Sequence, residues 1–102
     1  MDVLVRIKRL IVARRVRFTT KATEERERDG LTVEDVLESI LNANAIKKVL
    51  RSRSPRRRRS VEHLYVIESP TFTGTWVYSK GTIRQQRGEE VFYVFVSATL
   101  SI

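Results

Sequence analysis

Apolar residues recur at helical spacing at the start of the chain. They form one stripe, made of Val3, Leu4, Ile7, Leu10 and Ile11. Arginines fall mostly off this stripe, as expected for an amphipathic helix that buries one side. Thr19 and Thr20 are both suited to cap a short, strongly charged second helix. The pair Asp29 and Gly30 should end that helix, since glycine adopts the left-handed conformation common at helix C-termini.

A third helix has the clearest start signal. Thr32 and Asp35 stand three residues apart, the spacing of a variant capping box, and Leu31 can pack onto Val36 across the first turn. Asparagines at positions 42 and 44 suit its end. The residues that should face the core are Val33, Val36, Leu37, Ile40 and Leu41.

After Ala45 the apolar period shortens toward two, which predicts β-strands. We expect four strands, at residues 46–51, 62–68, 73–84 and 89–100, with a bend at Gly81. Helices grouped before strands favour an α+β fold, an antiparallel sheet of about four strands with the helices packed on one face. The 102 residues match one ordinary domain, so we expect a single domain over 1–102.

Composition narrows the class of protein. The chain has no cysteine, which excludes a disulfide framework and a thiolate zinc site and is typical of a cytoplasmic protein. The longest uncharged apolar run, 91–96, is far too short to span a bilayer. We therefore expect a cytoplasmic protein with no membrane partner and no cofactor or metal. Its oligomeric state stays open.

The net charge of +8 comes from one segment. Residues 45–61 contain eight basic residues and no acidic one, while the rest of the chain is balanced. The basic residues are Lys47, Lys48, Arg51, Arg53, Arg56, Arg57, Arg58 and Arg59. We expect residues 51–60 to form an exposed, mobile loop that binds phosphates, because guanidinium groups bond phosphate oxygens in pairs. A solvated hairpin tip and a contact for an acidic protein remain alternatives.

Strand alternation predicts an RNA-binding face. It places Leu64, Val66 and Val77 in the core. The side chains expected on the opposite face, away from the helices, are His63, Tyr65, Trp76, Tyr78 and Lys80. Aromatic rings stack on unpaired bases and lysine neutralises phosphate, which suits single-stranded RNA. Alternatively, the rings pack beneath a loop or in a dimer contact.

These residue types can also cleave RNA without a metal ion. Such cleavage needs a base for the 2′-hydroxyl, cations for the pentacovalent phosphorane and an acid for the leaving 5′-oxygen. His63 is the only histidine and the candidate base, with Tyr78 as a further acid–base group. The candidate cations are Lys48, Arg51, Arg53, Lys80 and Arg84. Alternatively, His63 has only a structural role.

Several segments together resemble the MqsR-type toxins of bacterial toxin-antitoxin pairs, within the RelE-like superfamily. They are VRFTTKA at 16–22, DGLTVEDV at 29–36, IKKVL at 46–50, GTWVYSKGTI at 74–83 and VFVSA at 94–98. The resemblance implies a RelE-like fold and an endoribonuclease that cuts messenger RNA, leaving a 2′,3′-cyclic phosphate and a 5′-hydroxyl. It also implies a cognate antitoxin protein as partner.

The resemblance points to particular residues. Lys48, Tyr78 and Lys80 resemble the lysine, tyrosine and adjoining basic residue of the family's site. His63 stands near a position where a glutamine is found, and Thr99 replaces a basic residue of the last strand. Two alternatives to a nuclease stay open, a non-catalytic RNA- or DNA-binding module and a protein-interaction subunit with a basic docking loop. An antitoxin would bind along the first helix, where Val5 and Val12 border the buried stripe.

Overall fold

The computed structural model describes residues 2–53, 61–86 and 90–102, with Ser52, Arg53, Val61, Gln86 and Glu90 described by their backbone alone. Three helices lie where the sequence predicts them: α1 (Val3–Val12), α2 (Thr20–Arg28) and α3 (Val33–Leu41). Each begins at a side chain that accepts a hydrogen bond from the first turn, and at α3 the bonds between Thr32 and Asp35 form the predicted capping box.

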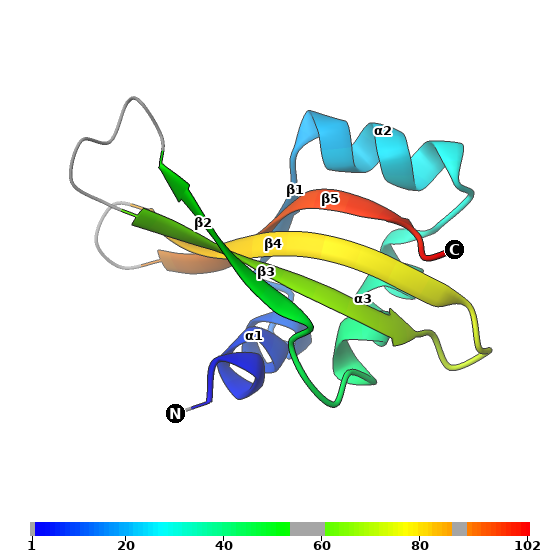
Figure 1. Cartoon of the computed structure of the whole chain (residues 1–102), viewed down its shortest axis with the longest axis horizontal. Helices are drawn as coiled ribbons and strands as arrows, with labels where there is room; N and C mark the ends of the chain where they lie inside the picture. The colour runs from blue at the N-terminus through cyan, green and yellow to red at the C-terminus, as the bar shows by residue number, and fades with distance from the viewer. Residues whose placement is uncertain (1, 54–60, 87–89) are drawn as a thin grey trace.

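Five strands form one sheet, in the order β1-β5-β4-β3-β2 (Figure 1). They are β1 (Val16–Phe18), β2 (Lys48–Arg53), β3 (Val61–Pro70), β4 (Trp76–Gln86) and β5 (Glu90–Leu100). All pairs are antiparallel except β1 with β5, which run parallel. The α+β class is therefore confirmed, but the sheet is mixed and has one strand more than predicted. At three residues, β1 is too short to show a period of two.

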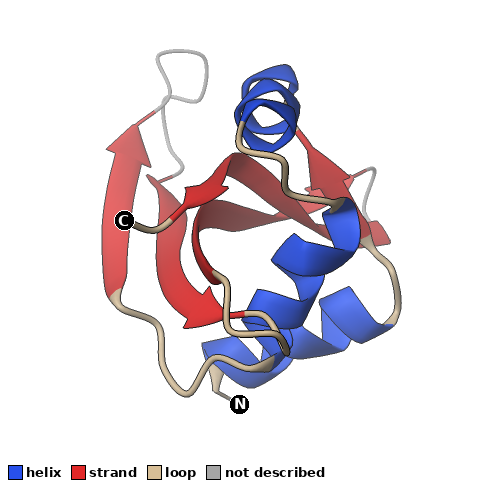
Figure 2. Ribbon diagram, turned by 90° about the vertical axis from the view of Figure 1, so that its right-hand side faces the viewer, coloured by secondary structure: helices blue, strands red, loops and turns tan. Residues whose placement is uncertain are grey.

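Helices α1 and α3 pack together on one face of the curved sheet (Figure 2). The core between them is formed by Leu4, Ile7, Ile11, Val36, Leu37, Ile40, Ile67, Val77, Tyr93 and Phe95. Two residues that we expected in this core, Val33 and Leu41, are each 37% exposed. They are the first and the last residue of α3.

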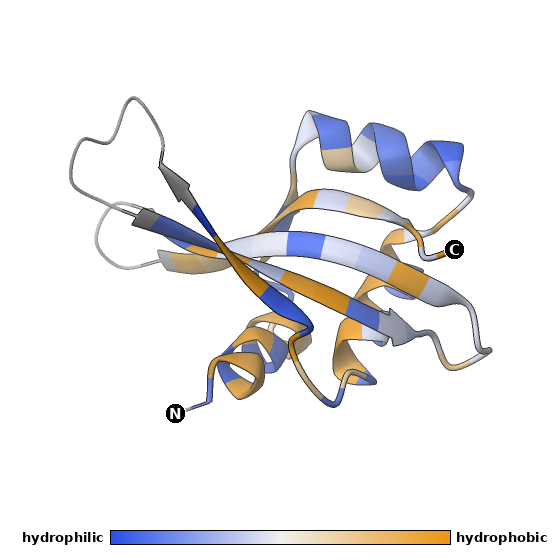
Figure 3. Ribbon diagram, in the orientation of Figure 1, coloured by the Kyte–Doolittle hydropathy of each residue, from blue (hydrophilic) through white to orange (hydrophobic). Residues whose placement is uncertain are grey.

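Helix α2 does not lie on that face but follows the edge of β5, which corrects the prediction that every helix packs on one face. Strand β1 pairs with only the middle of β5, at residues 93–95. Helix α2 lies along the C-terminal part of the same edge. Carboxylates of Glu25 and Asp29 accept hydrogen bonds from the backbone amides of Ala98 and Leu100. This position suits the sequence of α2, which is mostly hydrophilic and buries only Ala22 (Figure 3).

At the predicted bend, the register between β4 and β5 shifts between Lys80 and Gly81, and the residue left without a partner is Val96 of β5. The ring of buried Tyr93 lies across this glycine, and a Cβ atom built there would stand 2.5 Å from Tyr93 Cζ. Because glycine has no Cβ atom, the Tyr93 ring can lie directly against the backbone at this point. Among the described residues, no helix is long and apolar enough to cross a membrane.

Candidate nucleic-acid interface

In the described part of the chain, no helix crosses the centre of the sheet face opposite α1 and α3; we call this face the open face (Figures 1 and 2). Side chains alternate along strands, so the residues between those of the core point to it. On β2, β3 and β4 its main residues are Lys48, Leu50, Glu62, Leu64, Val66, Glu68, Trp76, Tyr78, Lys80, Thr82 and Arg84. On β5 they are Phe92, Val94, Ser97 and Thr99.

The backbone register brings three predicted site residues together on the open face. Lys48 pairs with Val66, and Val66 pairs with Lys80, so the two lysines flank one buried valine in a single cross-strand row. At a strand spacing of about 4.8 Å, their Cα atoms lie roughly 10 Å apart. Tyr78 stands two residues along β4 from Lys80, between Glu68 and Thr99 in the next row. The row of two lysines and this tyrosine form the centre of the candidate site.

His63 and Tyr65 are not part of this surface, contrary to the prediction. Tyr65 pairs with Gly81 and packs against the core, so it points to the helix side of the sheet. His63 is two residues away on the same strand and shares that side, where it is exposed. Leu64 and Val66, which we expected in the core, point to the open face, although Val66 is buried there as predicted. The cause is a register that differs by one residue, which exchanges the two faces of a strand.

The arginines predicted for the site do not all lie on one face of the sheet. Arg84 is on the open face, whereas Arg51 is exposed opposite His63 and points to the other side. For Arg53 only the backbone is described, and Arg56, Arg57, Arg58 and Arg59 lie outside the described residues. Trp76 is 53% exposed at the far end of β4, where it pairs with Pro70.

Each carboxylate of the open face has its own cation. Glu62 accepts from Arg84 Nε at 2.9 Å. Glu68 is bonded to Lys47 and accepts from Ser101 Oγ at 2.7 Å. The bonds from Lys47 and Ser101 lower the pKa of Glu68, so its carboxylate stays ionised at neutral pH.

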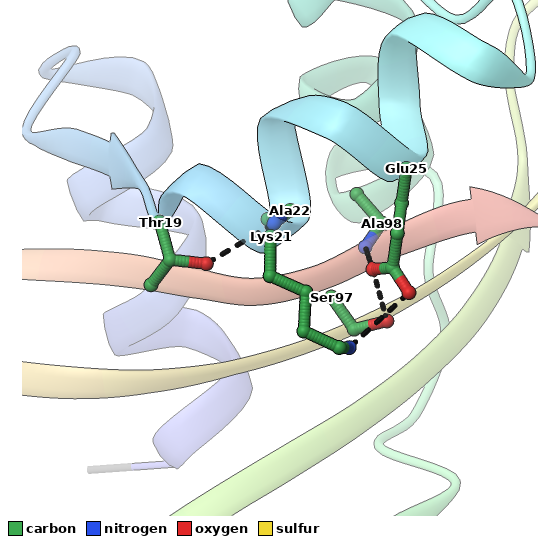
Figure 4. A network of polar contacts seen from close by, with 6 residues as sticks. All are labelled: Thr19, Lys21, Ala22, Glu25, Ser97 and Ala98. Atoms are coloured by element: carbon green, nitrogen blue, oxygen red, sulfur yellow. Dashed lines mark hydrogen bonds and ion pairs between the residues drawn. The ribbon is translucent and has the colours of Figure 1, made fainter.

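Helix α2 contributes a third such pair at the border of the open face (Figure 4). Glu25 accepts from Lys21 Nζ at 3.1 Å and from Ser97 Oγ at 2.8 Å. Its burial favours a raised pKa, but the bonds from Ser97, Lys21 and the Ala98 amide outweigh burial and leave the pKa lowered. The sequence offered no signal for Lys21, because only the tertiary structure brings α2 beside β5.

Lys48 and Lys80 stand apart from these pairs. Within the part of the chain that the structure describes, neither forms an ion pair. Their positive charge is therefore available to an anion in solution. A hollow of about 290 Å³ lies beside Lys80 and is lined also by Lys21, Glu62, Leu64, Arg84 and Val96. Three cations thus surround one depression on the open face.

The open face can bind phosphate, but it carries no histidine, because His63 lies on the other side of the sheet. Among the described residues, no three histidine, cysteine, aspartate or glutamate side chains gather into a group that could hold a metal ion. Comparison of the chain with protein-family models, with curated proteins and with solved structures finds no match.

Proposed function

We propose that the chain is an endoribonuclease that binds single-stranded messenger RNA on the open face and cleaves it without a metal ion, as a toxin acting in the cytoplasm. The observation that carries the proposal is the row in which Lys48 and Lys80 flank Val66, with Tyr78 beside them. Two ammonium groups on either side of an apolar valine, with no ion pair among the described residues, suit a phosphate with its charge spread over several oxygens.

The proposed reaction is an internal transesterification. The 2′-oxygen attacks phosphorus, the bond from phosphorus to the 5′-oxygen breaks, and a 2′,3′-cyclic phosphate and a 5′-hydroxyl result. Lys48 and Lys80 stabilise the negative phosphorane, and Tyr78 donates its phenolic proton to the leaving oxygen. Glu68, the carboxylate paired with Tyr78 in the register, accepts the proton of the 2′-hydroxyl. Its lowered pKa makes it a weak base, which predicts slow cleavage.

A single-turnover assay with labelled RNA in EDTA tests this assignment. We expect Tyr78→Phe and Glu68→Gln each to lower the cleavage rate by about 10² to 10⁴, the usual cost of one lost acid or base. His63→Gln is the matched control, because His63 lies on the other side of the sheet and its loss should leave the rate unchanged. A rate that falls with His63→Gln and survives Tyr78→Phe would reject the open-face site.

A second candidate function is RNA binding without cleavage. Thr99, which pairs with Tyr78, stands where the resemblance to MqsR-type toxins implies a basic residue, so the row beside Tyr78 has one cation fewer. Wild-type protein that binds RNA in a salt-dependent manner, yet leaves it intact with and without added Mg²⁺, would favour this function. The two lysines would then serve as phosphate contacts only.

We also propose that a cognate antitoxin covers the outer side of α1. Val5 and Val12 are 42% and 70% exposed there, and they line a shallow apolar groove together with Lys8, Arg9 and Ala13. Expression of the chain alone should then arrest growth, and co-expression of the neighbouring gene should restore it. Normal growth with abundant wild-type protein would contradict the toxin assignment.

A further inference from the structure

A second hollow lies on the open face, toward the end where β1 joins the sheet. Its volume is about 170 Å³, and it is lined by Arg17, Phe18, Thr19, Arg84, Phe92 and Val94. Arg17, Val94 and Phe92 point to the open face in the register of β1, β5 and β4. Arg84 also lines the hollow beside Lys80, so one guanidinium separates the two depressions.

The walls of this hollow are aromatic and held in place. The Arg17 guanidinium lies 4.4 Å from the centre of the Phe92 ring, a cation–π contact. Phe18 stacks on buried Phe95 with 4.6 Å between ring centres. Arg84 is fixed by two contacts to Glu62, from Nε at 2.9 Å and from Nη2 at 2.8 Å. An aromatic ring and two oriented guanidinium groups therefore surround a small space.

The size and chemistry of the hollow select its occupant. An apolar cavity of about 150 Å³ is large enough to take benzene, so 170 Å³ accommodates one six-membered ring. The Arg17 guanidinium, held over the Phe92 ring, offers a planar stacking surface, and Arg84 offers donors to the carbonyl oxygens of a base. We propose that this hollow binds one pyrimidine base of the RNA, and that it gives the protein a sequence preference. The inference rests on the proposed RNA-binding function of the open face.

The position of the hollow relative to the lysines fits a single strand of RNA. Arg84 lies four residues along β4 from Lys80, roughly 13 Å at the rise of an extended strand. A backbone phosphate above Lys80 and Lys21 leaves a base of the same strand within reach of Phe92. Arg84 stands between the phosphate and the base, with its donors directed by Glu62. The preference would therefore apply at a fixed distance from the cleaved bond.

The test measures the affinity of three labelled strands of equal length and charge: oligouridylate, oligoadenylate and a strand without bases. Wild type should bind oligouridylate about 5- to 150-fold more tightly than the abasic strand, the range for one stacked base, and more tightly than oligoadenylate. Phe92→Leu keeps an apolar side chain but removes the ring, and it should reduce the advantage of oligouridylate while abasic binding stays unchanged. Phe72→Leu is the matched control, since Phe72 is an exposed ring in the turn between β3 and β4.

The outcomes separate this inference from the ribonuclease proposal. Loss of the uridylate advantage in Phe92→Leu, with the advantage kept in Phe72→Leu, supports the base pocket even if no RNA is cleaved. An advantage that survives Phe92→Leu, or that only Trp76→Leu removes, overturns the pocket while cleavage in EDTA would still support the nuclease. Tighter binding of oligoadenylate overturns the choice of a pyrimidine. Failure to bind any strand overturns both proposals.

Discussion

Replacing Tyr93 by phenylalanine should make the protein more stable. Tyr93 is fully buried, and its hydroxyl has no hydrogen-bond partner among the described residues. Its ring is well packed, edge-on to Phe95 at 5.0 Å and across Gly81. The substitution keeps that ring and removes only the oxygen.

The expected gain follows from the cost of burying an unbonded polar group, about 1 to 3 kcal/mol. For a domain of this length, each 1 kcal/mol changes the melting temperature by about 4 to 8 °C. Tyr93→Phe should therefore raise the melting temperature by at least about 4 °C, measured by circular dichroism, and raise the urea midpoint with an unchanged slope. Tyr78→Phe is the control, and its change should remain within about 0.5 kcal/mol.

A second measurement uses alkaline pH. Burial, with a smaller contribution from Tyr65, raises the pKa of Tyr93. A raised pKa in the folded state gives stability that is complete below the ordinary tyrosine pKa of about 10 and is lost as the pH rises above it. Tyr93→Phe should therefore lose less stability than wild type between about pH 10 and 12. A variant that is less stable at neutral pH by about 1 kcal/mol, as for a bonded hydroxyl, would refute the reasoning.

Three further predictions concern other parts of the molecule. Glu25→Gln should lower the free energy of unfolding by about 1 to 3 kcal/mol and make it depend less on pH in the acid range. The lowered pKa of Glu25 gives stability that is present above pH ~4.3 and is lost as the pH falls through the folded-state pKa. An unchanged urea midpoint at neutral pH would contradict this prediction. Gly81→Ala should lower the free energy of unfolding by about 1 to 3 kcal/mol, because the new Cβ atom would meet the Tyr93 ring. Equal melting temperatures of wild type and variant would show that the ring moves freely. The RNA affinity of the wild type should fall about 50-fold between about 50 and 200 mM salt if four phosphates are neutralised. Replacing the arginines at 56–59, which lie outside the described residues, by serines should make the affinity less dependent on salt. An identical slope in this variant would place the RNA contacts elsewhere.

Local signals in the sequence were sufficient to predict where the helices lie. The capping box of Thr32 and Asp35 depends on residues within one turn, so their spacing alone predicts it. Of the two candidate caps of α2, Thr19 and Thr20, the structure uses Thr19. Gly81 marked the place where the register between β4 and β5 shifts, although the extra residue lies in β5. By contrast, β1 owes its place to the pairing with β5, which lies far away along the chain.

The candidate site could be predicted only in part, because it depends on register. Pro70 pairs with Trp76, so even-numbered residues of β3 stand opposite even-numbered residues of β4. This pairing separates His63 from Tyr78, and one residue more or less in the turn at 71–75 would have brought them to one face. Lys48, Tyr78 and Lys80 do share the open face. Phe92 could not be linked to them, since only the fold brings it beside Arg84.

The carboxylates of α2 have a consequence for how copies of this chain meet in a cell. An uncovered strand edge is a template on which another chain can add a strand, a route to aggregation. At β5 the amides of Ala98 and Leu100 are already occupied by Glu25 and Asp29, so that edge offers them no further pairing. On the opposite side of the sheet, the outer strand β2 starts with Lys48 and carries Arg51, and a second copy would have to bring the same charges alongside. The carboxylates of α2 beside β5 and the positive charges of β2 thus both oppose the addition of a strand from a second copy at these two places.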